Sequence, residues 1–276
     1  MRETFMMTSE INKYIWDELN SLDGFAHLRK LQEQQPDREF WVVGGLIRNI
    51  LIKKTHGYLP THKDIDVLVD DRNDKIFERP FDFRSLFDGS TNRINYNAER
   101  NKKLENYKYQ INKLKPVVST KIRYDFFVVS NHFMRINYNK IKSVKTYIEN
   151  FDFHMNSCMF SVKNKKFIAT DGFFNAIEKK DINMIWSGVN CKMEMSGFMH
   201  NNLIANYKLF GRIFVFEIKL GFTLNDEVLD KLNSPIDDTN PQLLKETIDL
   251  KLMCNYIRDR GYGKNIDDIL TRFFNI

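Results

Sequence analysis

The sequence predicts a mixed α/β region up to about residue 190 and a helical region after it. Before residue 190, segments with apolar residues at helical spacing alternate with short runs of β-branched and aromatic residues. After about residue 200, the apolar residues recur at helical spacing. No internal repeat is visible, so we place one boundary near 190–198.

The composition is that of an ordinary globular protein. The chain has 276 residues, 42% hydrophobic and 28% charged, which argues against a disordered chain. No stretch approaches the roughly 20 apolar residues of a membrane span, and the first residues lack a signal-peptide pattern. Three dispersed cysteines indicate neither a disulfide framework nor a zinc site, so we expect a reducing, cytoplasmic setting. Abundant Asn, Lys, Ile and Phe are typical of an AT-rich genome such as a phage's, which would place the protein in the host cytoplasm.

Helical and strand-like segments alternate in the first 70 residues. Ser9 is the expected N-cap of the first helix, and Pro36 ends that segment. The next strand stops at Gly44-Gly45, and helical spacing follows. The elements expected here are a helix over 9–34, a strand over 40–43, a helix over 46–51 and a strand over 64–69.

Residues 71–116 are polar and weakly periodic, and we interpret them as an insertion of loops and short helices. The elements expected beyond them are strands over 122–129, 156–162 and 166–170, with a turn at 163–165, and helices over 140–149, 200–220 and 243–258.

A glycine pair and two carboxylates form the most informative pattern. Asp64 and Asp66 stand at i and i+2 on a predicted strand, so they share a face at about 6–7 Å. Mg²⁺ prefers such oxygen ligands and keeps water and substrate phosphate as further ligands. The turn at Gly44 and Gly45 allows backbone N–H groups close to a triphosphate at a helix start. The pattern therefore predicts a site for a nucleotide and a metal.

A third carboxylate would complete a two-metal site. Asp125 lies on a predicted strand that could pair with the strand of Asp64 and Asp66. The three acids would hold two Mg²⁺ ions, or Mn²⁺ in their place, which activate the attacking hydroxyl and stabilise the leaving phosphate. The alternative is a structural acid at Asp125, paired with Arg123 or Lys121.

The pattern Gly44-Gly45-x-x-Arg48, then Asp64-x-Asp66, resembles the catalytic head of the DNA polymerase β nucleotidyltransferase superfamily, most closely tRNA CCA-adding enzymes and bacterial poly(A) polymerases. Residues 152–157, 171–182 and 212–222 resemble three further blocks of that head and its neck, in the same order. The resemblance implies an α/β (α+β) head with a mixed, mainly antiparallel sheet, followed by a helical neck and tail. It also implies nucleotide contacts from Gly44, Gly45, Arg48, Asp152, Asn156 and Arg212.

Four of these contacts have an alternative, and for Arg212 it is a contact to the head. Arg48 could be a surface helix residue, and Asp152 and Asn156 could serve only to hold the fold.

The sequence departs from the family pattern at several positions. Asn49 stands where the family usually has Asp, and the paired arginines before Asp152 are replaced. The Glu-Asp-x-x-Arg template of the neck would fall at Ala205, Asn206 and Leu209, none of which matches. We therefore expect the metal chemistry to be retained and the base selection to be lost or rebuilt.

The net charge of +6 permits a polyanionic partner. Lys102, Lys103 and Lys108 lie among interleaved tyrosines in the 71–116 insertion and could follow an RNA backbone. The alternative is a solvated insertion, just as Lys163-Asn164-Lys165-Lys166 would ordinarily be a solvated turn.

Together these observations predict an N-terminal helix over 1–36, a nucleotidyltransferase head over 37–192 and a helical neck and tail over 193–276. The expected reaction transfers NMP from an NTP to a hydroxyl, by resemblance an RNA 3′ end with tRNA first, and releases pyrophosphate. Transfer to a protein or small molecule is one alternative, and a non-catalytic nucleotide- or RNA-binding module is another. No membrane partner is expected.

Overall fold

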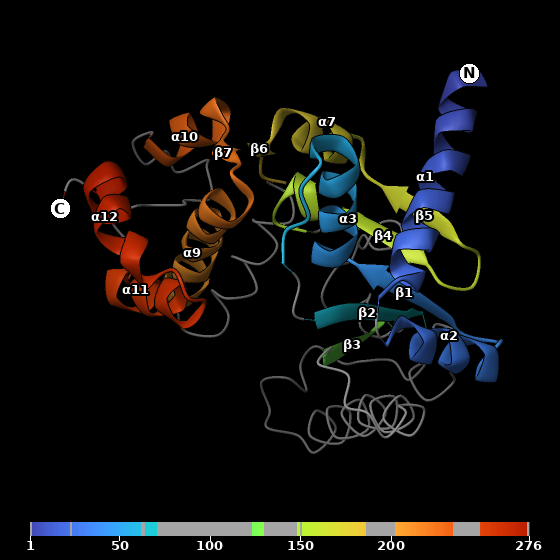
Figure 1. Ribbon diagram of the computed structural model, residues 1–276. Helices are drawn as coiled ribbons and strands as arrows, with labels where there is room; N and C mark the ends of the chain where they lie inside the picture. Colours follow the sequence, from blue (N-terminus) through green and yellow to red (C-terminus); the bar gives the residue numbers. More distant parts are fainter. Residues whose placement is uncertain are drawn as a thin grey trace, which may run out of the picture. The chain divides into compact units, whose positions relative to one another are not determined.

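The computed structural model describes residues 2–22, 24–61, 64–70, 123–129, 148–149, 151–185, 202–233, 249–274 and 276 (Figure 1). The chain forms two compact units, which we describe separately. The first comprises 1–148 with 158–169, and the second 149–157 with 170–276. The boundary expected near 190–198 lies outside the described residues and stays a prediction, as do the other expected domain limits.

The first unit begins with two helices, α1 (Arg2–Asn20) and α2 (Phe25–Gln34). The prediction of one helix over 9–34 is therefore wrong. The chain turns at Gly24, whose φ of 91° lies in the left-handed region that favours glycine. Ser9 is not an N-cap, because the backbone is already helical before it. The expected end before Pro36 is confirmed.

A five-stranded sheet in the order β3-β2-β1-β4-β5 forms the centre of the first unit. Its strands are β1 (Glu39–Val43), β2 (Asp64–Asp70), β3 (Arg123–Val129), β4 (Cys158–Ser161) and β5 (Lys166–Ala169). The β2–β3 pair is parallel, and the β1–β2, β1–β4 and β4–β5 pairs are antiparallel. The predicted mixed, mainly antiparallel sheet is thus confirmed.

One face of this sheet packs against helices. Register partners share a face, so Phe167, Phe160, Val42 and Val67 form a buried apolar row across four strands. The ring of Trp16 on α1 stacks on Phe160 at 6.2 Å between ring centroids. The α1 helix therefore covers this face.

The helix α3 (Gly45–His56) follows β1 and packs beside α1. Lys53 of α3 donates to Glu18 of α1 at 2.8 Å, and the ammonium of Lys54 lies 4.7 Å from the ring centroid of Tyr14. The predicted order of strand, glycine turn, helix and strand is confirmed (Figure 1).

The second unit is mainly helical. Its helices are η3 (His154–Asn156), α7 (Asp171–Lys179), α9 (Asn202–Leu220), α10 (Asp226–Asn233), α11 (Leu250–Asp259), η5 (Gly263–Asn265) and α12 (Ile266–Phe274). Two short strands, β6 (Asp181–Ile182) and β7 (Thr223–Leu224), pair in parallel. The helix predicted over 200–220 is confirmed. The described residues after 198 are mainly helical, as predicted, and they also include the two-residue strand β7.

Aromatic side chains hold these helices together. Phe214 of α9 packs against Phe273 of α12 at 4.8 Å between ring centroids, and Phe153 meets Phe216 edge-on at 5.3 Å. Tyr207 of α9 meets Tyr256 of α11 edge-on at 6.4 Å. The apolar side chains that recur at helical spacing on α9 therefore contribute to the core of the second unit.

Several predictions lie outside the described residues. These are the insertion over 71–116, most of the helix over 140–149 and the first part of the helix over 243–258. Within the described part of the chain, no helix is long and apolar enough to cross a membrane.

Candidate active site

The three predicted metal-binding positions come together in the sheet of the first unit. The β2–β3 register places Asp66 directly beside Asp125, and Asp64 beside Arg123. Because register partners share a face, Asp64, Asp66 and Asp125 all lie on the face opposite to the Val67 row and α1. The side chain of Asp66 is half-buried, whereas those of Asp64 and Asp125 lie outside the described residues.

The glycine turn lies at the same end of the sheet. Val42 pairs with Val67 in antiparallel register, so the chain leaves β1 at Gly44 near the point where β2 begins at Asp64. Gly44 has φ 65° and ψ −123°, a combination that other residues adopt only with strain. Its N–H donates to the carbonyl of Cys158 on β4 at 3.1 Å, which anchors the turn to the sheet. The α3 helix then starts at Gly45.

Arg48 lies in the interior behind this turn. It is 3% exposed, so its interpretation as a surface helix residue is wrong. A Cβ added at Gly45 would lie 3.6 Å from Nη2 of Arg48, which shows that the guanidinium reaches back to the turn. Burial lowers the pKa of Arg48 to about 10, so the side chain stays positively charged at neutral pH.

Asn49 contacts Arg48 through its side-chain amide. Its Oδ1 accepts hydrogen bonds from Nε of Arg48 at 3.0 Å and from Nη2 at 2.9 Å. Its Nδ2 donates to the carbonyls of Pro60 and Thr61, at 3.3 and 3.4 Å. In the sequence, Asn49 is distinguished only as a departure from a family pattern, and these contacts were not predicted.

The remaining predicted nucleotide contacts lie in the second unit. Asp152 is buried, and its carboxylate accepts a hydrogen bond from Nη1 of Arg212 on α9. Asn156 ends the short helix η3. The structure thus joins Asp152 to Arg212, and these residues stand in a different unit from Gly44, Gly45, Arg48 and the acidic positions.

His154 precedes Asn156 in η3 and packs against the start of α7. A Cβ added at Gly172 would lie 2.2 Å from its Nδ1, so only glycine fits there. Its Nδ1 is buried and has no hydrogen-bond partner among the described residues. Burial lowers the pKa of His154, and the charge of Glu227 opposes this shift.

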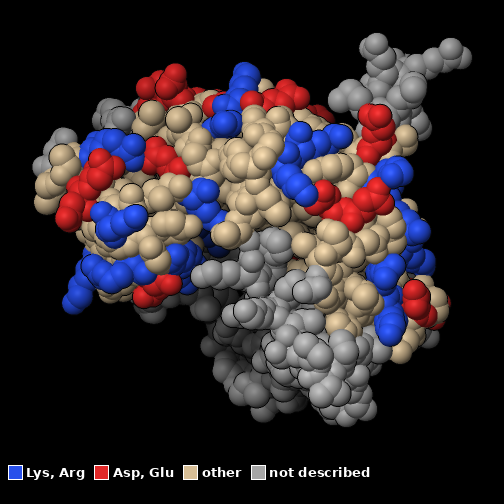
Figure 2. All heavy atoms as spheres, in the orientation of Figure 1, with Lys and Arg blue, Asp and Glu red and all other residues tan. Residues whose placement is uncertain are grey.

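The basic segments are only partly described. Lys102, Lys103 and Lys108 lie outside the described residues, so their RNA-binding role stays a prediction. Lys163 to Lys166 are exposed and include the turn between β4 and β5, where Lys163 donates to the carbonyl of Pro36 at 2.6 Å. On the face seen in Figure 2, acidic and basic side chains of the described residues are interspersed.

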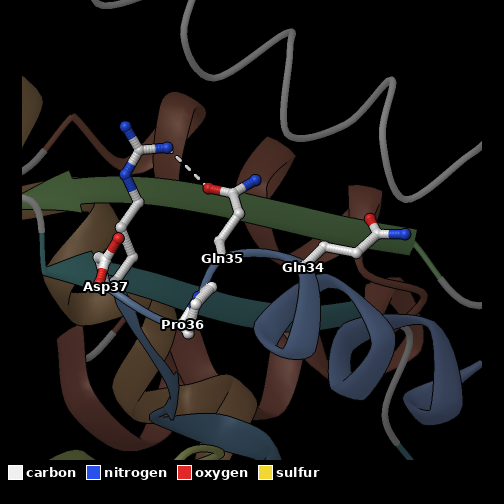
Figure 3. Close-up of a pocket in the computed structure, with 5 residues that line it drawn as sticks. Gln34, Gln35, Pro36 and Asp37 are labelled. Atoms are coloured by element: carbon white, nitrogen blue, oxygen red, sulfur yellow. Dashed lines mark hydrogen bonds between the residues drawn. The ribbon is translucent and has the colours of Figure 1, made fainter.

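A surface pocket lies at the other end of β1, between α2 and β1. It is lined by Gln34, Gln35, Pro36, Asp37 and Arg38, and Arg38 donates to Gln35 at 2.6 Å across it (Figure 3). Glu39 at this end pairs with Asp70, whereas the acidic positions lie toward the start of β2. The pocket is therefore separate from the candidate site.

The residue types at the sheet end fit a hard divalent cation. Carboxylates are oxygen donors, which Mg²⁺ and Mn²⁺ prefer, and no Cys or His stands among the three positions. Among the side chains that the structure describes, no group of three or more metal-ligating residues occurs. Metal binding at Asp64, Asp66 and Asp125 therefore stays a prediction that rests on backbone register and residue type.

Comparison with known proteins gave one family and a set of solved structures. The pattern of the Gabija anti-defense 2 family matches residues 13–180. No curated protein matches the chain. Solved structures match over most of the chain at low identity.

One is the Thermotoga maritima CCA-adding enzyme complexed with tRNA, with TM-score 0.47, 13% identity and coverage of 90% of this chain and 50% of that one. A CCA-adding enzyme complexed with ATP gives TM-score 0.48 and 12% identity, with coverage of 90% of this chain and 50% of that one. A tRNA nucleotidyltransferase complexed with a primer tRNA and an ATP analogue gives TM-score 0.45 and 14% identity, with coverage of 90% of this chain and 60% of that one. The chain spans about half the length of the first two.

Proposed function

The chain belongs to the Gabija anti-defense 2 family, and we propose that it is a metal-dependent nucleotidyltransferase that transfers NMP from an NTP to a hydroxyl acceptor. The observation that carries the proposal is the direct pairing of Asp66 with Asp125 in the β2–β3 register. Asp64 shares their face, and the Gly44-Gly45 turn lies at the same end of the sheet. All these positions fall within the residues matched by the family.

The glycine turn and α3 would bind the polyphosphate of the NTP. Without side chains at Gly44 and Gly45, the backbone at the start of α3 is open to a phosphate, and the helix N-terminus favours negative charge. The buried cation of Arg48 lies beside this turn. In the proposed reaction Arg48 acts through its positive charge and by holding the turn.

Asp64, Asp66 and Asp125 would hold two Mg²⁺ ions. Bound Mg²⁺ supplies a lower pKa for the acceptor hydroxyl and neutralises negative charge on the polyphosphate. The role of the protein's own residues is to place these acids on one sheet face beside the phosphate-binding turn. No other carboxylate is needed for this arrangement.

The reaction needs no covalent enzyme intermediate. The acceptor oxygen forms a bond to the α-phosphorus of the NTP, and the bond from that phosphorus to the bridging oxygen of the β-phosphate breaks. Pyrophosphate leaves with the bonding electrons, and the hydroxyl proton passes to solvent. Positioning and charge neutralisation supply the rate enhancement in such a mechanism.

The proposed reaction has two candidate acceptors, an RNA and a protein. The sequence resemblance favours an RNA 3′ end, with tRNA first. Membership of a family described as Gabija anti-defense favours an acceptor in that defence, and so supports the second candidate, transfer to a protein. In both cases the acidic positions perform the same chemistry.

A transfer assay tests the activity and separates these acceptors. The full-length protein is incubated with Mg²⁺ and each of the four α-labelled NTPs, with purified RNA or with proteins of cells that carry the Gabija defence. We expect label on one pool and stoichiometric pyrophosphate. Label on protein only from Gabija-carrying cells would support the second candidate. Absence of label and pyrophosphate in every reaction would contradict the proposed activity.

A further inference from the structure

We propose that the second unit carries a binding surface for single-stranded RNA on α9 and the end of α11. The surface consists of Tyr207, Lys208, Leu252, Tyr256 and Arg260, and we call it the Tyr256 cluster. The inference deepens the proposed function and rests on it for the choice of RNA, which is one of the two candidate acceptors. It does not depend on the acidic positions, because all five residues belong to the second unit.

The centre of the cluster is a cation held on an aromatic ring. Arg260 is the C-cap residue of α11, and its Cζ lies 3.3 Å from the ring centroid of Tyr256. Its Nη1 donates to the backbone carbonyl of Tyr256 at 3.2 Å. These two contacts orient an exposed side chain before any ligand binds, which reduces the entropy that binding would cost. A guanidinium carries five N–H donors, so several remain for a ligand.

The ring beneath this guanidinium is fixed in its turn. A Cβ added at Gly211 of α9 would lie 2.5 Å from Cδ1 of Tyr256, so the ring packs directly on the backbone of that helix. Tyr207 meets the same ring edge-on at 6.4 Å between ring centroids. The Tyr256 ring is therefore held between α9 and the Arg260 guanidinium, and both aromatic side chains are only half-buried.

A second cation and an exposed apolar side chain complete the cluster. Nζ of Lys208 lies 5.9 Å from the ring centroid of Tyr207. Leu252 lies one helical turn before Tyr256 on α11 and is 37% exposed, unusually much for a large apolar residue of this protein. Within the part of the chain that the structure describes, neither Lys208 nor Arg260 forms an ion pair. The surface therefore combines two uncompensated positive charges with rings and apolar area.

This combination fits a single nucleic-acid strand. The phosphates of a strand pair with cations, and its bases stack on aromatic rings and on guanidinium planes. A duplex keeps the faces of its bases stacked inside, so it would use only the charges. An acidic protein segment would also use only the charges and would leave the rings without a partner. The rings and the guanidinium together thus favour single-stranded RNA as the ligand.

The test measures RNA binding by the full-length protein without NTP. Fluorescence anisotropy gives the affinity for a labelled oligoadenylate of about 12 nucleotides, within the usual site sizes of single-strand binders. Arg260→Ala and Lys208→Ala each remove one charge, and Arg260→Lys keeps the charge but removes the planar group. Lys251→Ala is the matched control, because Lys251 is exposed on α11 but lies about 140° around the helix from Tyr256. Circular dichroism and thermal melting confirm that each variant is folded.

We expect Arg260→Ala to weaken binding on the order of tenfold and Arg260→Lys about fivefold, because stacking is lost in both. Arg260→Ala and Lys208→Ala should each flatten the slope of log affinity against log salt by about 0.7, whereas Arg260→Lys should leave it unchanged. Lys251→Ala should stay within about twofold of the parent. Oligoglutamate of the same charge, added as a competitor, should bind at least about tenfold more weakly than the oligonucleotide, since it cannot stack.

Three results would overturn the inference. Parent-like RNA affinity in both Arg260→Ala and Lys208→Ala would show that the Tyr256 cluster does not contact RNA. Parent-like affinity in Arg260→Lys, or equal binding of oligoglutamate, would show a surface that recognises charge alone and fits an acidic protein. Absence of oligoadenylate binding by the parent would also exclude the RNA surface. In each case the proposed function is decided separately, by label and pyrophosphate in the transfer assay.

Discussion

Arg212 on α9 donates a hydrogen bond to the carboxylate of Asp152, which lies 60 residues earlier in the chain. The side chain of Asp152 is 7% exposed, whereas that of Arg212 is 44% exposed. The Asp152 backbone is also fixed, because its carbonyl accepts from the N–H of Ile185 at 2.9 Å. Both residues were predicted to contact nucleotide. Their mutual pairing favours the alternative interpretation, in which Asp152 holds the fold of the second unit.

Arg212→Ala should therefore destabilise the protein. The change removes one cationic donor from a buried carboxylate, which costs about 1–3 kcal/mol, toward the lower end because Arg212 is partly exposed. Urea unfolding measures the loss of free energy, and Lys208→Ala, at an exposed position on the same helix, is the control. A combined Asp152→Asn and Arg212→Ala variant should be less destabilised than the sum of the single changes. Simple additivity would contradict the pairing.

The stability of the protein should depend on the protonation of His154. Burial lowers the pKa of this side chain in the folded state, so the unfolded chain binds the proton more tightly. The contribution is fully present above the unfolded pKa of about 6.5 and is lost as pH falls through that value toward the folded pKa. The free energy of unfolding should accordingly fall below pH 6.5, and His154→Leu should reduce this fall. An unchanged pH dependence in that variant would contradict the assignment.

The contact between α9 and α11 should depend on the absence of a side chain at Gly211. A Cβ there would lie 2.5 Å from Cδ1 of Tyr256, whose ring also carries the Arg260 guanidinium at 3.3 Å from its centroid. Gly211→Ala should cost about 1–3 kcal/mol through overpacking, more than the roughly 1 kcal/mol gained from helix propensity. Thermal melting measures the net effect. Adding Tyr256→Ala should remove the penalty of the alanine, and a persistent penalty would contradict this packing.

The first unit could largely be predicted because its patterns are local. Strand alternation at Asp64–Asp70 and the glycine pair after Val43 identify elements from a few neighbouring residues. The break between α1 and α2 was missed because Leu22 and Phe25 continue the apolar helical spacing across it, although Gly24 supplies the turn. The apolar spacing indicates which side chains are buried. One continuous helix and two helices separated by a turn can bury the same side chains, so the spacing does not distinguish them.

The partners of charged residues could not be predicted, because they depend on pairs distant in sequence. Nothing near Arg212 indicates that Asp152 is its acceptor, and nothing near Arg48 shows that it is buried. The hydrogen bonds of Asn49 had a signal in the sequence, since an amide beside an arginine can both accept and donate hydrogen bonds. That signal could only be interpreted once the carbonyls of Pro60 and Thr61 were placed.

An RNA acceptor predicts a role for the basic insertion. Replacement of Lys102, Lys103 and Lys108 by Glu should weaken RNA binding and flatten the slope of log affinity against log salt, because fewer counterions are released. A salt titration by filter binding measures this slope. ATP binding should be unaffected and serves as the control. Equal RNA affinity in parent and variant at every salt concentration would exclude these lysines as phosphate contacts.

The most direct test of the central claim compares the parent with Asp66→Ala in the transfer assay with α-labelled NTPs, Mg²⁺ and both acceptor pools. Asp66 is half-buried and pairs with Asp125 in the β2–β3 register, so the change removes an acid from the middle of the proposed site. The account predicts label transfer by the parent and a loss of at least about 10²-fold in the variant, with folding retained. Undiminished transfer by a folded Asp66→Ala variant would contradict it.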